Sequence, residues 1–130
     1  MEALIFDTTF LIDFQRERRM GAGPAHAFLA AQSESIALLP VTAYGEFAEG
    51  FDRPDDPQLV SVVDGFEILP ITQAVGAIYA AVVRKLRAQG GLIGTNDLWI
   101  AATAMGEQLP LVTRNTDHFT RVEGLQVRGY

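Results

Sequence analysis

The stretch ALIFDTTFLID (residues 3–13) contains the change from strand to helix that decides the fold. Residues 3–6 form a short apolar run with the β-branched Ile5, which is typical of a buried strand. Beyond them, Phe10, Leu11 and Phe14 recur at helical spacing within residues 8–18. We therefore expect a strand that turns directly into a helix, with Asp7 at the junction.

Short apolar runs and longer helical segments go on alternating along the chain. Further strands are expected at residues 35–39, 68–71 and 111–113. Helices are expected over residues 24–32, 43–50 and 54–63, from a cap at Thr72 to Gly90, and from residues 94–97 to about 108. Because such alternation builds parallel sheets covered by helices on both faces, the sequence predicts an α/β fold of three layers, α/β/α, with a central, mainly parallel sheet.

Length and composition predict a single domain over residues 1–130. The chain has 130 residues, of which 48% are hydrophobic, and this composition excludes the disordered class. It contains no cysteine, which excludes disulfides, thiolate metal sites and thiol nucleophiles. No apolar run reaches the roughly 18 residues of a membrane span, and no basic segment precedes the first apolar run. We therefore expect a cytoplasmic protein without a membrane segment.

The net charge of −6 argues against non-specific binding of nucleic acid, which depends on many Lys and Arg contacts to phosphates. Several acids gathered at one metal site would change this, because a bound divalent cation reverses the local field. The overall charge therefore does not decide the question.

Acidic residues occur where such a sheet would bring them together. Asp7 follows the first strand, Asn115 and Asp117 follow the fourth, and Asp97 lies at the start of the helix that leads into the fourth. Glu46 lies one turn into the helix after the second strand. Ligands bind beyond the carboxyl ends of parallel strands, so we expect the four acids to face one crevice. Carboxylates without His or Cys partners suit Mg²⁺ or Mn²⁺, and one or two such ions could activate a water for phosphodiester hydrolysis.

Each acid also has a structural alternative. Asp7 and Asp97 could cap helices, Asp117 could stabilise a turn, and Glu46 could be a solvated helix residue. The shared edge of the sheet favours the joint interpretation as a metal site.

Four segments carry a resemblance to a known family: LIFDTTFLID (4–13), TAYGEF (42–47), GTNDLWIAATA (94–104) and LVTRNTDHF (111–119). In this order and spacing, the chain resembles PIN-domain proteins, particularly the VapC-type toxins of toxin–antitoxin pairs. The resemblance implies a PIN-like sheet of four or five strands and a Mg²⁺-dependent endoribonuclease, with Mn²⁺ as the alternative ion. It further implies a homodimer and a small antitoxin that occupies a groove near the first helices and blocks the acids.

Carried over by position, the resemblance makes Asp7, Glu46 and Asp97 metal-binding and catalytic acids. Family members place a fourth acid either at the position of Asn115 or two residues later, and we assign it to Asp117. The resemblance gives Thr113 and Asn115 the role of orienting Asp7 or a metal-bound water.

Other polar and aromatic residues are weighed individually. Arg114 is predicted to bind RNA, because its neighbours place it beside the crevice. His118 is interpreted as a turn residue without a paired acid, Trp99 as a core residue, and His26 as a surface helix residue. Arg16, Arg18 and Arg19 are interpreted as solvated charges at the end of the first helix, where cations complement the helix dipole.

Two other functions remain as alternatives. The segment Phe6-Asp7-Thr8-Thr9 resembles the nucleophile loop of haloacid-dehalogenase-like phosphatases, but Thr9 stands where that chemistry needs a second acid. A PIN-fold interaction module without catalysis is the other alternative, and the presence of the core acids argues against it.

Overall fold

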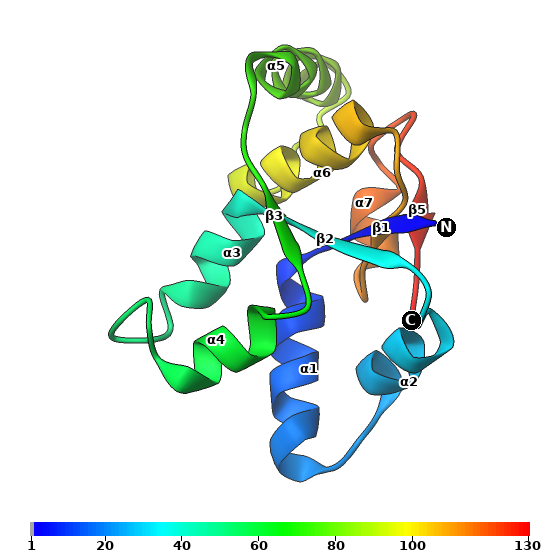
Figure 1. Ribbon diagram of the computed structural model, residues 1–130. Coiled ribbons are helices and arrows are strands. Elements are labelled where there is room, and N and C mark those ends of the chain that lie inside the picture. Colours follow the sequence, from blue (N-terminus) through cyan, green and yellow to red (C-terminus); the bar gives the residue numbers. More distant parts are fainter. Residues whose placement is uncertain (1) are drawn as a thin grey trace.

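A parallel sheet of five strands lies at the centre of residues 2–130, the part of the chain that the computed structural model describes. The strand order is β3-β2-β1-β4-β5 (Figure 1). The strands are β1 (Ala3–Phe6), β2 (Ile36–Pro40), β3 (Glu67–Leu69), β4 (Leu111–Val112) and β5 (Val127–Arg128). Neighbouring strands in this sheet pair in parallel throughout, which confirms the predicted parallel sheet.

Helices cover both faces of the sheet, as Figure 1 shows. They are α1 (Thr8–Met20), α2 (Pro24–Ala31), α3 (Val41–Ala48), α4 (Pro57–Val63), α5 (Gln73–Ala88), α6 (Thr95–Glu107) and α7 (Thr116–Phe119). Successive residues of β1 point to opposite faces: Ile5 belongs to a core that includes α5 and α6, whereas Leu4 and Phe6 belong to a second core with residues of α1 and α2. This arrangement confirms the predicted three-layer α/β class.

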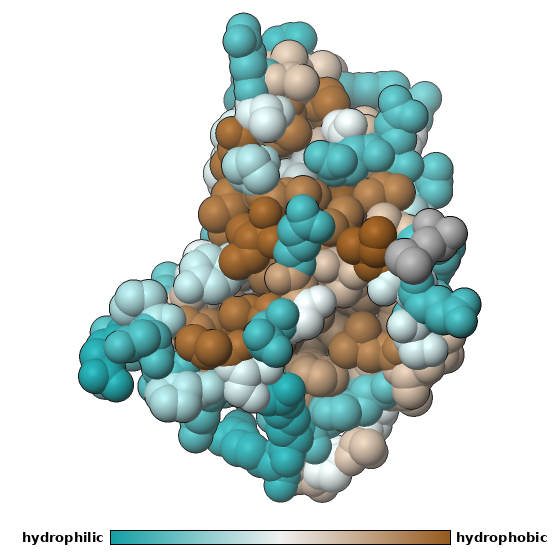
Figure 2. Space-filling view, in the orientation of Figure 1, coloured by the Kyte–Doolittle hydropathy of each residue, from teal (hydrophilic) through white to brown (hydrophobic). Residues whose placement is uncertain are grey.

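Apolar side chains gather over the middle of the face that carries β2 and β3, as Figure 2 shows. Ile36, Ile68 and Ile71 are exposed large apolar residues of this region. None of the helices within residues 2–130 has both the length and the apolar composition needed to cross a membrane.

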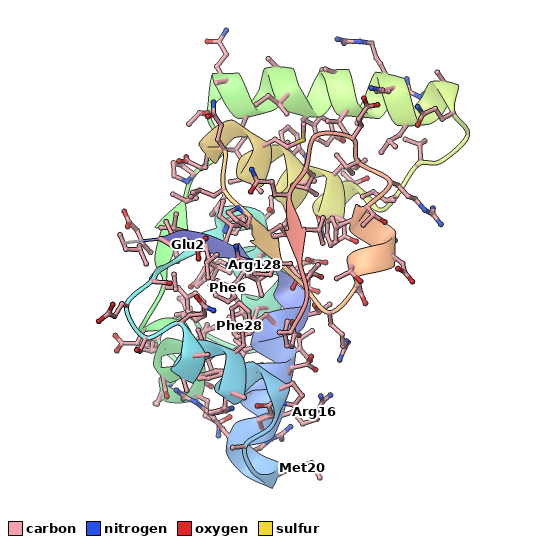
Figure 3. The ribbon with its side chains drawn as sticks, turned by 90° about the vertical axis from the view of Figure 1, so that its right-hand side faces the viewer. Glu2, Phe6, Arg16, Met20, Phe28 and Arg128 are labelled. Atoms are coloured by element: carbon pink, nitrogen blue, oxygen red, sulfur yellow. The ribbon has the colours of Figure 1, made fainter. Side chains whose placement is uncertain are left out.

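Aromatic packing fixes the start of α1 against the end of β1. The ring of Phe6 lies 4.6 Å from that of Phe10 and 6.0 Å from that of Phe28, and Figure 3 labels Phe6 and Phe28. The ring of Phe66 is a third neighbour of Phe6, with ring centroids 5.4 Å apart. Such pairs contribute about 0.5–1.5 kcal/mol each beyond the area they bury. The junction between β1 and α1, where Asp7 lies, is therefore rigidly held.

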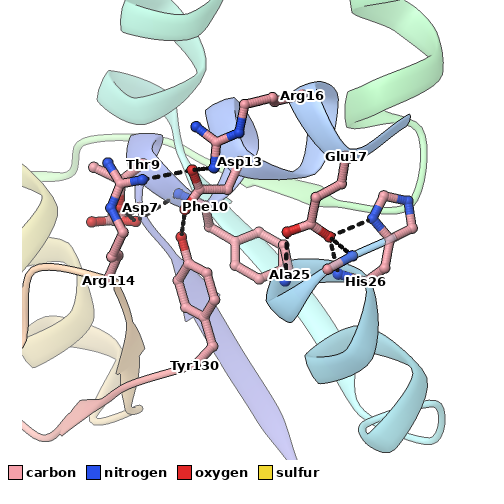
Figure 4. Close-up of polar contacts among 11 residues, drawn as sticks. Asp7, Thr9, Phe10, Asp13, Arg16, Glu17, Ala25, His26, Arg114 and Tyr130 are labelled. Atoms are coloured by element: carbon pink, nitrogen blue, oxygen red, sulfur yellow. Dashed lines mark hydrogen bonds and ion pairs between the residues drawn. The ribbon is translucent and has the colours of Figure 1, made fainter. Parts of the chain in front are cut away.

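Glu17 of α1 caps the N-terminus of α2 (Figure 4). Its buried carboxylate accepts hydrogen bonds from the backbone N–H groups of Gly23, Ala25 and His26 and from the His26 ring, at 2.8–2.9 Å. These are N–H groups that a helix cannot satisfy by itself. His26 lies on α2, as predicted, but its side chain is only partly exposed, because it stacks on Phe14 as well as contacting Glu17.

The last strand is tied to the first. Both terminal nitrogens of the Arg128 guanidinium donate to the Glu2 carboxylate, at 3.0 and 3.1 Å, and Figure 3 labels this pair. Two parallel hydrogen bonds of this kind fix orientation as well as distance. They help to define the path of the chain towards Tyr130.

Several element boundaries differ from those predicted. The third helix begins at Val41 after Pro40, and Thr42 does not cap it; the Thr42 hydroxyl is buried without a hydrogen-bond partner among residues 2–130. The fourth helix begins at Pro57, because Asp56 caps it by accepting from the Gln58 N–H at 2.9 Å.

Neither β5 nor α7 was predicted. The cap at Thr72 is confirmed by its hydrogen bond from the Val75 N–H.

Candidate active site

The candidate site begins where β1 and β4 end side by side. Ile5 pairs with Leu111 and Phe6 with Val112, so the next residues, Asp7 and Thr113, emerge together at the carboxyl edge of the sheet. The Thr113 hydroxyl donates to Asp7 Oδ2 at 2.5 Å. It also accepts from the Asn115 N–H at 3.0 Å, which links the following loop to the same position.

Asp7 is the most deeply buried acid of the site. Only 1% of its surface is exposed, and its Oδ1 accepts from the Phe10 N–H at 3.1 Å and from the Thr9 hydroxyl at 2.8 Å. The contact with Phe10 makes Asp7 the cap of α1, as the structural alternative proposed. Burial raises the pKa of Asp7 against the lowering effect of these hydrogen bonds, and the charge of Asp97 raises it further. Asp7 is therefore both a helix cap and a carboxylate held close to another negative charge.

Asp97 and Glu46 complete a group of acids that influence one another. Asp97 lies in the first turn of α6, and Glu46 lies on α3, where the Thr8 hydroxyl donates to its Oε1 at 2.6 Å. Burial raises the pKa of Asp97, the His118 contact lowers it, and the charge of Glu46 raises it. Gly94 is the N-terminal cap of α6, so Asp97 does not have the capping role considered for it. Asp7, Asp97 and Glu46 are thus brought within electrostatic reach across three elements of the fold, and we call them the acidic group.

The acidic group is not a closed metal cage. Within residues 2–130, no three His, Asp or Glu side chains converge closely enough to hold one ion by themselves. Mg²⁺ commonly takes only one or two carboxylates and keeps several of its waters, because it gives up water reluctantly. The side-chain atoms that the acidic group and its threonine neighbours offer as metal ligands are all oxygen atoms, and Mg²⁺ prefers oxygen ligands.

Asp117 is exposed in the first turn of α7. It lines an open recess of about 470 Å³ that is also bordered by Arg114, Asn115, Thr116 and His118. The structure therefore places Asp117 on a rim beside the other acids.

His118 has the paired acid that the sequence did not indicate. Its Nε2 lies 2.9 Å from Asp97 Oδ2, so the prediction of a turn residue without such a partner is wrong. The two residues are 21 positions apart and come from α7 and α6, and only the fold brings them together. His118 therefore connects the recess to the acidic group.

Asp13 is a polar residue of this region that sequence reasoning missed. It is 3% exposed, and Figure 4 shows its carboxylate accepting from Arg16, Arg114 and Tyr130. The distances are 2.7 Å from Arg16 Nη2, 2.6 Å from Arg114 Nη1 and 2.6 Å from the Tyr130 hydroxyl. Arg114, predicted to contact RNA, is thus anchored at one end of its guanidinium by a buried carboxylate.

Trp99 lies near the site but packs against a neighbouring helix. It is half-buried and stacks on Tyr79 of α5, with ring centroids 3.7 Å apart and planes 10° from parallel. This contact belongs to the packing of α5 on α6.

A parallel sheet covered on both faces, with acids collected at the carboxyl ends of its central strands, defines an α/β protein with a group of acids at the edge where ligands bind in such sheets. The PIN domain family matches residues 4–125, and the chain belongs to this family.

Its relatives in sequence are named as ribonucleases. The chain is 30% identical to Ribonuclease VapC1 of Methanocaldococcus jannaschii, across 98% of this chain and 86% of that protein. It is 37% identical to Ribonuclease VapC of Rickettsia bellii, across 95% of this chain and 93% of that protein. These matches span nearly the whole chain.

Solved structures of toxin–antitoxin complexes share the fold. The VapBC2 complex of Rickettsia felis, bound to a DNA fragment from its promoter, contains a chain that matches with a TM-score of 0.84 at 21% identity, over 98% of both chains. The DNA-bound VapBC complex of Salmonella typhimurium gives a TM-score of 0.83 at 19% identity, over 99% of this chain and 98% of that one.

Proposed function

We propose that this chain is a Mg²⁺-dependent endoribonuclease of the VapC type, acting as the toxin of a type II toxin–antitoxin system. The observation that carries the proposal is the acidic group at the carboxyl edge of the sheet. The similarity to VapC ribonucleases along almost the full chain supports RNA as the substrate. Family membership also removes the basis for the phosphatase alternative.

The acidic group fits a hard divalent cation. Burial raises the pKa of both Asp7 and Asp97; the charge of Asp97 adds to the rise at Asp7, and the charge of Glu46 adds to the rise at Asp97. A bound cation would relieve this unfavourable charge. Asp7, Asp97 and Glu46 would hold the ion partly through the waters that it retains, because the three side chains do not converge on one point, and Asp117 is proposed as the fourth acid. Bound Mg²⁺, or Mn²⁺ in its place, would supply an activated water and stabilise the charge that develops on the leaving oxygen.

The residues around the acids hold them in place for this task. Thr9, Thr113 and the Phe10 N–H fix both oxygens of Asp7, while Thr8 fixes Glu46. His118 holds Asp97 from the side of α7. Such supporting hydrogen bonds keep metal-binding groups in their productive orientation.

The recess beside the acidic group is proposed to receive the RNA backbone. Arg114 has a side chain that is half exposed there and offers donors for a phosphate oxygen, although the protein as a whole carries a net charge of −6. Asn115 is proposed to orient a metal-bound water, and Thr113 to orient Asp7.

The partners and the location are proposed from the family similarity. The similar solved structures are complexes of a toxin with its antitoxin, and we propose an antitoxin partner and a homodimer for this chain, acting in the cytoplasm. Binding of such an antitoxin should suppress cleavage.

A cleavage assay tests the function. Purified protein is incubated with total RNA in Mg²⁺ or in EDTA, and the 5′ ends of the products are sequenced. Cleavage at defined positions in Mg²⁺, and none in EDTA, is the expected result. Intact RNA in both arms, with a folded protein, would support the interaction module without catalysis instead.

A further inference from the structure

Three segments distant in sequence meet at the buried carboxylate of Asp13. Arg16 lies on α1 with it, Arg114 follows β4, and Tyr130 follows β5. Both arginines donate to Oδ1, and the Tyr130 hydroxyl donates to Oδ2 (Figure 4). Buried carboxylates are costly unless they are paired and hydrogen-bonded, and Asp13 meets both conditions. We call these four residues the Asp13 network.

The network leaves most of the Arg114 guanidinium free. Asp13 engages Nη1, whereas the side chain is 50% exposed and lines the recess beside Asp117 and His118. A guanidinium has five N–H donors in a fixed plane, so anchoring one nitrogen sets the direction of the others. The network also joins one carboxylate to two arginines, which leaves a net positive charge next to the acidic group.

Tyr130, which follows the edge strand β5, supports Asp13 through its hydroxyl. Its ring packs on Phe10 with centroids 4.9 Å apart, so removing the hydroxyl alone leaves the packing in place. Burial raises the pKa of Tyr130 above its ordinary value, and the hydrogen bond to Asp13 and the charges of Asp13 and Asp7 add to the rise. Tyr130 therefore remains a hydrogen-bond donor to Asp13 at any working pH.

We propose that Asp13 and Tyr130 are positioning residues that hold the Arg114 guanidinium at the rim of the acidic group, where it binds a phosphate of the RNA. This inference rests on the proposed ribonuclease function and adds the residues that set its substrate affinity. The network acts on binding of the RNA backbone rather than on the hydrolytic step.

A double-mutant cycle tests the proposal. Tyr130→Phe is expected to raise KM for RNA about three- to tenfold, the effect of one ordinary hydrogen bond, with kcat within about twofold of the wild type. In an Arg114→Ala background the same substitution should leave KM unchanged, because the group that it positions is absent. Tyr79→Phe is the matched control, since it removes a tyrosine hydroxyl on α5, and it should leave both constants unchanged.

The outcomes separate this proposal from the function on which it rests. A wild-type protein that leaves RNA intact overturns the proposed function and this inference with it. Cleavage by the wild type, with a rise in KM that is the same in both backgrounds or absent in both, overturns the inference alone. Asp13→Asn gives a second test: it should raise KM in the presence of Arg114 and not in its absence, with folding checked by circular dichroism.

Discussion

Thr113 donates a 2.5 Å hydrogen bond to Asp7 Oδ2, although 106 positions separate the two residues. The contact joins the carboxyl ends of β1 and β4, which are neighbours only in the assembled sheet. The most buried acid of the site is therefore oriented by the fold as a whole.

Thr113→Val is expected to impair both stability and cleavage. Valine keeps the shape of threonine but removes the donor to Asp7 and the acceptor of the Asn115 N–H, so we expect a loss of about 1–3 kcal/mol in the free energy of unfolding. Urea unfolding and the RNA assay measure the two effects. Thr103→Val is the control: it is equally buried, but its hydroxyl donates only to the Trp99 carbonyl within α6, so cleavage should persist. Full activity of Thr113→Val would argue against an orienting role.

Asp97→Asn is expected to stabilise the metal-free protein at neutral pH. The pKa of Asp97 is raised in the folded state, so the folded protein binds this proton more tightly than the unfolded chain and its stability falls as pH rises through the folded pKa. Asparagine removes that loss. In EDTA at pH 7, differential scanning calorimetry should show a Tm about 2–5 °C higher than the wild type, the range for roughly 1 kcal/mol at this length. A variant whose Tm falls well below that of the wild type would contradict an unfavourable effect of burial and of the Glu46 charge on the Asp97 carboxylate.

Glu17 should make stability depend on acid pH. Burial raises its pKa, but hydrogen bonds from His26, Ala25 and Gly23 outweigh this and lower the pKa from 4.5 to about 2. Because the folded pKa is depressed, the stability it contributes is complete above pH 4.5 and is lost as the pH falls from 4.5 towards 2.

Glu17→Gln is expected to cost about 1–3 kcal/mol at pH 7 and to flatten this acid-induced loss, because glutamine offers one acceptor oxygen where two are used. Urea unfolding at a series of pH values measures both effects. Glu34→Gln, at an exposed position, provides the comparison. If the free energy of unfolding changes with pH equally in Glu17→Gln and in the wild type, the capping role is contradicted.

Asp117→Asn distinguishes the two candidates for the fourth acid. Asp117 is exposed, so the substitution should leave the free energy of unfolding unchanged while lowering the cleavage rate about tenfold or more. Asn115→Ala should have a smaller effect on the rate. If Asn115→Ala proves the more damaging substitution, the fourth role belongs to Asn115.

The elements that hold the site could be predicted where they are long or strongly marked. The change from an apolar run to helical spacing around Asp7 predicted β1 and α1, and the Thr72 cap predicted the start of α5. β5 has two residues, one of which is Arg128, and α7 has four, so neither shows an apolar run or a helical period, and both were missed.

The contacts of the site likewise fall into a group that the sequence predicts and a group that it does not. A parallel sheet predicts that residues after β1 and β4 share an edge, and Asp7 and Thr113 do so. The partners of Asp13 and Asp97 depend on tertiary packing, and no local rule pairs Asp13 with Tyr130 or Asp97 with His118. One indication was present in the sequence: Asp13 falls three residues after Phe10, on the apolar side of α1, where an unpaired acid would be unfavourable.

The acidic group is proposed to bind a divalent ion. Titration with Mn²⁺, followed by electron paramagnetic resonance of the free ion, measures this without RNA. Binding by the wild type, its loss in Asp97→Asn, and its persistence in Asp64→Asn, an exposed acid after α4, are the predicted results. Equal binding by Asp97→Asn and the wild type would contradict the account.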